Sequence, residues 1–145
     1  KLNIMKNLAL IIALIIPTVF MAQSSRDVNL IIQKTIDLNA LKNFYSDSEK
    51  TGETPLIIIN DSKIPNNLII FKFNKRVKIM TTEELETFKS IYKGNLDSYF
   101  VFEVLDFKDD QVTIKATFRK NEKIAINVSM KKEANQWTVV DSSAG

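Results

Sequence analysis

Apolar and polar residues alternate along the C-terminal third of the chain. The clearest run spans residues 111–119, in which every second residue from Val112 to Phe118 is apolar. Successive side chains of a β-strand point to opposite faces, so this run predicts a strand with one dry and one wet face. The same alternation predicts strands at residues 124–131 and 137–140.

Short, mostly polar segments separate these strands. They occupy residues 108–110, 120–122 and 133–136 and contain Asp and Asn. These two residue types favour turns, because their side chains bond to the neighbouring backbone and tolerate left-handed geometry. Together with residues 99–107, the runs predict four consecutive antiparallel strands, a meander.

Residues 99–107 are apolar on both faces of the predicted strand. Strict alternation places Tyr99 and Glu103 on one face, and Phe100 and Phe102 on the other. A strand that is apolar on both sides is usually central in its sheet and covered on both faces. The alternative is that part of this apolar surface forms a ligand pocket or a dimer interface.

A long amphipathic helix is predicted over residues 27–45. Its apolar residues recur at steps of three and four, from Val28 to Tyr45, and form a continuous stripe. Ser24 or Ser25 can cap its start. We expect this helix to cover the sheet of its own domain.

The next part of the chain predicts short elements. A polar loop at residues 46–55 is followed by apolar runs at 56–59, 68–73 and 77–80, which predict brief strands. A hairpin turn at residues 74–75 is expected to join the last two.

A second, shorter helix is predicted over residues 82–92. Thr81 and Glu84 have the spacing of a capping box, in which each side chain satisfies the other residue's free backbone N–H. Its inward side is predicted to hold Leu85, Phe88 and Ile91. Gly94 suits a left-handed end to this helix.

Residues 1–24 have the pattern of a secretory signal peptide. Lys6 precedes an apolar segment at residues 8–20, and Ala22 or Ser24 supplies the small residue expected before a cleavage site. The apolar segment is shorter than the roughly 20 residues that span a bilayer, so we expect cleavage and no membrane-spanning segment afterwards. The product is expected to be soluble and periplasmic or secreted. It is not expected to be a lipoprotein, because no cysteine follows the cleavage site.

Residues 25–145 are long enough for a single α+β domain. The sequence has no Cys and no His, which excludes thiol and imidazole nucleophiles, zinc sites with nitrogen or sulfur ligands, and disulfides. We therefore predict no catalytic residue, no metal and no cofactor. Without Lys1 and Lys6, 18 basic and 17 acidic side chains remain. A net charge of +1 does not indicate a nucleic-acid partner.

The predicted order of elements resembles the cystatin-like and nuclear-transport-factor-two-like α+β folds. The final hairpin, at residues 128–132 and 136–140, is similar to that of small secreted bacterial proteins of this group. The resemblance implies a long N-terminal helix packed on a curved antiparallel sheet that ends in a four-strand meander. The group includes enzymes, ligand carriers and docking modules, so the resemblance implies no single activity.

Two activities of the group can be compared with the residues. Protease-inhibiting cystatins carry a Gln-x-Val-x-Gly hairpin, and the nearest stretch, residues 111–115, lacks its spacing and its glycine. Isomerase-like and dehydratase-like members need an acid or base between helix and sheet, for which Glu103 beside Tyr99 is the candidate. A buried carboxylate can serve as a general base. A solvated or lysine-paired Glu103 is the alternative.

Charged clusters supply further candidates. Four basic side chains crowd one predicted hairpin: Lys72, Lys75, Arg76 and Lys78. They either meet lipid headgroups, polysaccharide or an acidic protein surface, or form a charged edge that prevents aggregation. Asp106, Asp109 and Asp110 lack the calcium-loop pattern and are expected to form a turn.

The sequence therefore leads to two hypotheses. The first is a non-enzymatic extracytoplasmic binding or protein-interaction module, with an envelope or secreted protein as partner or a second copy paired through the sheet. Its candidate contact residues are Tyr99, Phe100, Phe102, Lys115 and Arg119. The second is a small-ligand carrier or a weak isomerase-like or dehydratase-like enzyme, with a pocket lined by Tyr99 and Glu103.

Overall fold

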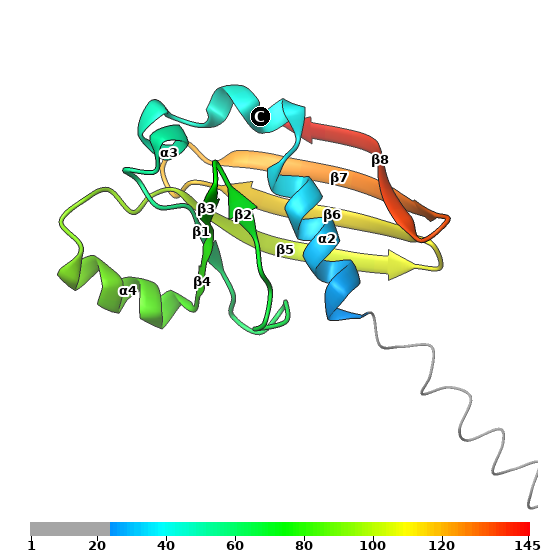
Figure 1. Cartoon of the computed structure of the whole chain (residues 1–145), viewed down its shortest axis with the longest axis horizontal. Coiled ribbons are helices and arrows are strands. Elements are labelled where there is room, and N and C mark those ends of the chain that lie inside the picture. The colour runs from blue at the N-terminus through cyan, green and yellow to red at the C-terminus, as the bar shows by residue number, and fades with distance from the viewer. Residues whose placement is uncertain (1–23) are drawn as a thin grey trace, which may run out of the picture.

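A six-stranded sheet forms the centre of the fold in the computed structural model, which describes residues 24–145 (Figure 1). The strands, in the order β4–β1–β5–β6–β7–β8, are β4 (Lys78–Met80), β1 (Ile57–Ile59), β5 (Tyr99–Lys108), β6 (Gln111–Phe118), β7 (Ile124–Glu133) and β8 (Gln136–Ala144). β1 runs parallel to both neighbours, and the other pairs are antiparallel. The predicted α+β class and the meander are confirmed, but the sheet is uncurled where a curved one was expected. Residues 1–23 of the predicted signal peptide lie outside the described residues.

A bulge in β5 changes which of its side chains share a face. The register with β6 shifts between Phe102 and Val104, so Glu103 is an extra residue without a partner on β6. One inserted residue exchanges the faces of all positions that follow it. Leu105 and Phe107 therefore pack on the same core as Phe102. Strict alternation predicts that Leu105 and Phe107 share the face of Tyr99, and this prediction is wrong.

Two hydrophobic cores lie on opposite faces of the first half of β5. Phe100 and Phe102 belong to the main core, which α2 (Ser25–Ile36) helps to cover. Tyr99 and Val101 pack instead on a smaller cluster that includes Leu85 of α4 (Thr82–Ile91). The apolar residues on both faces are thus covered within the chain, as the interpretation of a central strand predicts.

The single long helix predicted over residues 27–45 is wrong in its length. α2 ends at Ile36, and a 3₁₀ helix, η1 (Asn39–Phe44), follows a break at Asp37 and Leu38. The Tyr45 hydroxyl donates to the Ile36 carbonyl oxygen at 2.7 Å, which satisfies a carbonyl left free at the helix end. In a continuous helix Tyr45 would lie about 13 Å further along the axis, out of reach of this carbonyl.

A short helix interrupts the loop predicted at residues 46–55. α3 (Asp47–Thr51) begins with a capping box between Ser46 and Glu49 and ends at Gly52, whose φ is 79°. Glycine adopts this left-handed conformation readily and commonly ends helices. The Ser-x-x-Glu spacing was the sequence signal for this helix.

α4 confirms the second predicted helix and its capping box. The Thr81 hydroxyl accepts from the Glu84 N–H, and the Glu84 carboxylate accepts from the Thr81 N–H. Leu85 is buried, but Ile91 is 72% exposed, so its predicted inward position was wrong. The cluster beneath α4 is built on β1, which is only three residues long. It covers Phe88 but leaves Ile91, at the end of the helix, in solvent. The helix ends before Gly94, whose backbone is not left-handed.

The strand predicted at residues 68–73 is reduced to a two-residue strand. β2 (Phe71–Lys72) and β3 (Lys75–Arg76) form a separate two-stranded sheet. The turn between them lies at Phe73 and Asn74, one residue before the predicted position. β4 then leaves this hairpin and joins the edge of the main sheet beside β1.

Two amide side chains of α2 form hydrogen bonds with the backbone of residues 69–71, as a neighbouring strand would. Asn29 Oδ1 accepts from the Ile69 N–H at 2.7 Å, and Asn29 Nδ2 donates to the Ile69 carbonyl oxygen at 3.1 Å. Gln33 bonds in the same way to both backbone groups of Phe71, at 3.0 and 2.8 Å. Asn29 and Gln33 are four residues apart on the helix, and Ile69 and Phe71 are two residues apart on an extended segment. Both separations are about 6 to 7 Å, so each amide lies beside one of these two residues. We call this arrangement the amide clamp.

Asp27 joins α2 to the last two strands. Its carboxylate accepts hydrogen bonds from Trp137 Nε1 at 3.1 Å and from Lys132 Nζ at 3.2 Å, and its side chain is 17% exposed. Burial alone would raise the pKa of this carboxyl. The hydrogen bonds from Trp137, Lys132 and Ser24, with the charge of Lys132, outweigh burial and lower the pKa below its usual 3.8.

We expect Asp27→Ala to lower the free energy of unfolding near pH 7 by about 2 kcal/mol, because hydrogen bonds to a charged group are lost. Asp27→Asn should cost less, since its amide oxygen can still accept from Trp137. A lowered pKa stabilises the fold above the unfolded value of 3.8, and this contribution is lost as the pH falls through the folded value. Urea unfolding near pH 7 and near pH 3 should therefore show a smaller gap between wild type and Asp27→Asn at the lower pH. An equal gap would mean that the charge of Asp27 contributes nothing.

Candidate functional site

Phe100 and Phe102, two of the predicted contact residues, lie in the main core. Their exposed fractions are 0% and 3%, and the Phe100 ring stacks on Phe118 with the ring centroids 4.3 Å apart. The predicted contact surface is wrong at these two positions, because the strand that carries them is covered on both faces.

Tyr99 and Glu103 do not line a common pocket. Tyr99 packs on the cluster beneath α4, and burial raises the pKa of its phenol. Glu103 is exposed in the bulge of β5, and its backbone carbonyl oxygen accepts from Lys63 Nζ at 3.1 Å. An exposed carboxylate lacks the desolvated surroundings that the general-base hypothesis requires.

Lys115 and Arg119 do not share the polar sheet face either. Lys115 is exposed on β6, whereas Arg119 follows the end of that strand with a φ of 74° and turns toward α3. Arg119 Nη2 lies 2.8 Å from a Glu49 carboxylate oxygen and 2.8 Å from the Phe44 carbonyl oxygen. The Glu49 side chain is 0% exposed and also accepts from the Ser98 hydroxyl. Arg119 is therefore one half of a buried ion pair that joins α3 to the sheet.

We expect Arg119→Ala to lower the free energy of unfolding by about 3 kcal/mol, because it leaves the Glu49 carboxylate buried without a cation. Lys115→Ala, the matched control, removes a cation from an exposed position and should change the value by less than about 0.5 kcal/mol. Urea unfolding followed by circular dichroism measures both. Equal effects of the two substitutions would contradict the assignment of Arg119 to a buried pair.

The β2–β3 hairpin departs from two local preferences. Lys72 lies directly opposite Lys75 in the register, and like charges in such a pair destabilise a two-stranded sheet. Phe73 and Asn74 have φ values of 52° and 60°. Turns of this kind favour Asn and Gly, and an aromatic residue at positive φ is unusual. Departures of this kind are concentrated at functional sites.

Contacts with Asp37 and Tyr45 hold one side of the hairpin. Lys72 Nζ is 2.7 Å from the Asp37 carboxylate and lies over the rings of Tyr45 and Phe73, 5.3 and 5.2 Å from their centroids. These two rings meet edge to face with their centroids 5.1 Å apart. Burial, together with the charge of Asp37, raises the pKa of the Tyr45 phenol, which keeps its hydroxyl protonated as a donor. Lys72 is thus compensated within the fold.

Lys75, the other member of the pair, extends across Gly52 of the neighbouring segment. Its Nζ donates to the Gly52 carbonyl oxygen at 3.3 Å, and a Cβ added to Gly52 would come within 2.4 Å of the Lys75 side chain. Glycine is needed here for its positive φ, whereas the flexible end of the Lys75 side chain can move aside. Within residues 24–145, Lys75 has no carboxylate partner, unlike Lys72.

Two hollows, both lined in part by Lys72, are bordered by most of the basic side chains of this region. One, of about 200 Å³, lies between α3 and the hairpin. The other, of about 330 Å³, is bordered by η1 and α3 and lined by Lys42 and Lys50. Their linings hold six cations, which we call the basic hairpin surface: Lys42, Lys50, Lys72, Lys75, Arg76 and Lys78.

The charge of this surface is locally unbalanced. Two carboxylates, Asp37 and Glu49, line the same hollows, and both already bond to Lys72 or Arg119. A third carboxylate, Asp47, lies 3.7 Å from Lys50. The other four cations have no carboxylate partner within residues 24–145: Lys42, Lys75, Arg76 and Lys78. The part of the sequence after Lys6 carries only one positive charge in total. The cations are therefore concentrated here rather than spread evenly over the protein.

An apolar patch adjoins the basic hairpin surface. The amide clamp leaves Ile69 and Phe71 52% and 51% exposed, and Leu30 of α2 is 37% exposed. Leu30 and Ile69 line the same shallow hollow. We call these three side chains the apolar patch. Sequence reasoning missed it, although the Asn-x-x-x-Gln spacing on the predicted helix was a signal for the clamp behind it.

Comparison with protein-family models, with curated proteins and with solved structures found no match to the chain. Among residues 24–145, no group of three or more Asp or Glu side chains is placed to hold a metal ion. In the same part of the chain, no helix has the length and apolar character needed to cross a membrane. The basic hairpin surface and the apolar patch are the features on which a function can be argued.

Proposed function

We propose that this protein is a non-enzymatic extracytoplasmic binding module that recognises an anionic partner through the basic hairpin surface. The observation that carries the proposal is the pair of opposed lysines, Lys72 and Lys75, of which only Lys72 has a carboxylate partner among the described residues. An anion bound beside Lys75 would give this lysine the counter-charge that Asp37 already gives Lys72.

The arrangement of the cations supports this proposal. They come from three neighbouring parts of the chain, with Lys42 on η1, Lys50 on α3, and Lys75 and Arg76 on β3. Cations that line a hollow raise the local concentration of an anionic partner and speed its association. Lys72 is fixed between two rings and a carboxylate, so little order has to be created when a partner binds.

The alternative explanation, a charged edge that prevents aggregation, fits only part of this surface. Lys78 lies on β4, which is an edge of the six-stranded sheet, and a lysine there would discourage pairing with another chain. Lys72 and Lys75 belong to the separate two-stranded sheet, and the Lys72 side chain is only 16% exposed. The charge of Lys72 is already neutralised by Asp37 within the fold.

The carrier or enzyme hypothesis is weakened by the positions of its two candidate residues. Tyr99 packs beneath α4 and Glu103 is exposed in the bulge, so they do not form a site together. Binding without catalysis is therefore the function that the arrangement of side chains favours.

The location and the partner class are part of the same proposal. The extracytoplasmic location comes from the sequence pattern of residues 1–24, and it makes an envelope or secreted molecule with acidic groups the expected partner. Membership of the cystatin-like and nuclear-transport-factor-two-like fold group is proposed on the order of the elements alone. Pairing of two copies through the outer sheet face, where Lys115 is exposed, remains a separate prediction.

We expect the double substitution Lys75→Glu with Arg76→Glu to weaken binding of fluorescein-labelled heparin by about tenfold or more, because two cations of the surface become anions. Fluorescence anisotropy measures the affinity. Added salt should weaken wild-type binding more steeply than binding of the double variant.

The matched control is Lys115→Glu with Lys123→Glu, which changes the net charge equally at exposed positions elsewhere. It should reduce the affinity by less than about threefold. Equal losses in the two double variants would mean that heparin senses only the net charge, and the proposal would fail. Circular dichroism checks that both variants are folded.

A further inference from the structure

We propose that the basic hairpin surface and the apolar patch act together as one face that docks onto an anionic lipid bilayer. This inference rests on the proposed function and names its partner. It also gives the apolar patch a role, because its side chains would enter the apolar boundary of the bilayer while the cations contact phosphate headgroups.

The fold itself holds the apolar patch outward. The amide clamp bonds both backbone groups of Ile69 and of Phe71, so neither residue can turn inward without losing these hydrogen bonds. The alternate residues, Leu68 and Ile70, are 2% and 0% exposed. The exposure of Ile69 and Phe71 therefore follows from the way in which the amide clamp pairs alternate residues of this segment with α2.

Cations flank the apolar patch on the elements that carry it. Arg76 lies opposite Phe71 in the β2–β3 register, so the two side chains project from the same face of the hairpin. Arg26 and Lys34 lie one helical turn before and after Leu30 on α2, and both are exposed. None of these three cations has an ion-pair partner within residues 24–145.

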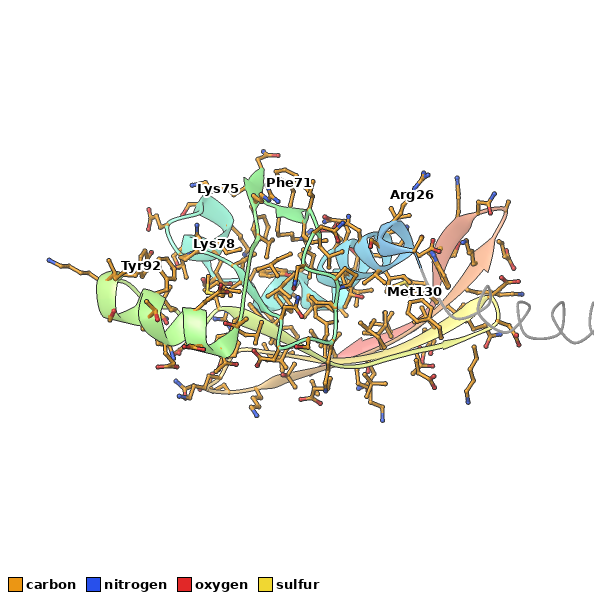
Figure 2. The ribbon with its side chains drawn as sticks, turned by 90° about the horizontal axis from the view of Figure 1, so that it is seen from below. Arg26, Phe71, Lys75, Lys78, Tyr92 and Met130 are labelled. Carbon is orange, nitrogen blue, oxygen red and sulfur yellow. The ribbon has the colours of Figure 1, made fainter. Side chains whose placement is uncertain are left out.

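Lys75 of the hairpin and Arg26 of α2 lie on the same side of the molecule as Phe71 of the apolar patch. Figure 2 shows Arg26, Phe71 and Lys75 along the side that is farthest from the sheet, with Met130 of the core between α2 and the sheet. Docking through this side leaves the polar outer face of the sheet turned away from the bilayer.

A bilayer fits this face better than an acidic protein or a soluble polyanion does. The boundary between headgroups and acyl chains accepts protruding apolar side chains of any shape, and anionic lipids attract the cations around them. A protein partner would need a cavity shaped for Phe71. A soluble polyanion would leave the apolar patch in water, which is unfavourable.

Co-sedimentation with vesicles tests the inference on the chain from Gln23 to Gly145, which contains all the described contacts. The vesicles are phosphatidylcholine alone or with one third phosphatidylglycerol. We expect binding only to the anionic vesicles, and a loss of about tenfold with Phe71→Ser, because an inserted aromatic side chain is removed. Arg76→Glu should weaken binding by about fivefold or more. The control is Ile91→Ser, which removes an equally apolar side chain that is 72% exposed on α4 and should leave binding unchanged.

A second measurement separates insertion from simple attraction of charges. The only tryptophan of the wild type, Trp137, is 3% exposed, so its emission should not respond to vesicles. In Phe71→Trp, the added indole should shift its emission to shorter wavelength when anionic vesicles are present. Unchanged emission of Trp137 in the Phe71→Ser variant checks that this variant is folded.

The outcomes distinguish the inference from the proposed function. Binding to heparin without binding to anionic vesicles would overturn the bilayer as partner and leave the proposed function in place. Vesicle binding that Phe71→Ser does not weaken, with no emission shift in Phe71→Trp, would also overturn it, because only charge attraction would remain. Binding to neither probe would end both proposals.

Discussion

Backbone N–H and C=O groups need hydrogen-bond partners when a protein folds. This constraint determines the position of residues 69–71 on α2. On one side they meet β3, to which Phe71 is paired. On the other side Asn29 and Gln33 of α2 supply the donors and acceptors that a neighbouring strand would otherwise provide. The hairpin, the hollows beside it and the apolar patch all depend on this contact, because it sets which side chains of the segment face outward.

The sequence predicts the parts of the fold that rest on local patterns. The meander follows from alternation and turn residues, and α4 follows from its capping box. The departures have long-range causes: the bulge at Glu103 is visible only against β6, and α2 stops at Ile36 where the distant Tyr45 hydroxyl takes its carbonyl. Arg119 leaves the predicted sheet face because its partner, Glu49, lies on another element.

The candidate site was predictable only in part. The basic residues of the hairpin were evident from their crowding in the sequence, although the turn was placed one residue too late. The sequence predicts Phe100 and Phe102 as contact residues because its local pattern does not show that α4 covers the other face of β5. The exposure of Phe71 could not be read from its run of apolar neighbours, since it depends on the register that α2 imposes.

β1 lies between two strands that follow it in the chain, and this has a consequence for biosynthesis. Its parallel partners are β4 and β5, and the first turn of α2 is held by Asp27 to Trp137, close to the end of the chain. Neither contact can form until the later segments have been made. A chain synthesised from its N-terminus therefore cannot complete the sheet around β1, or fix the first turn of α2, until β5 and β8 have left the ribosome.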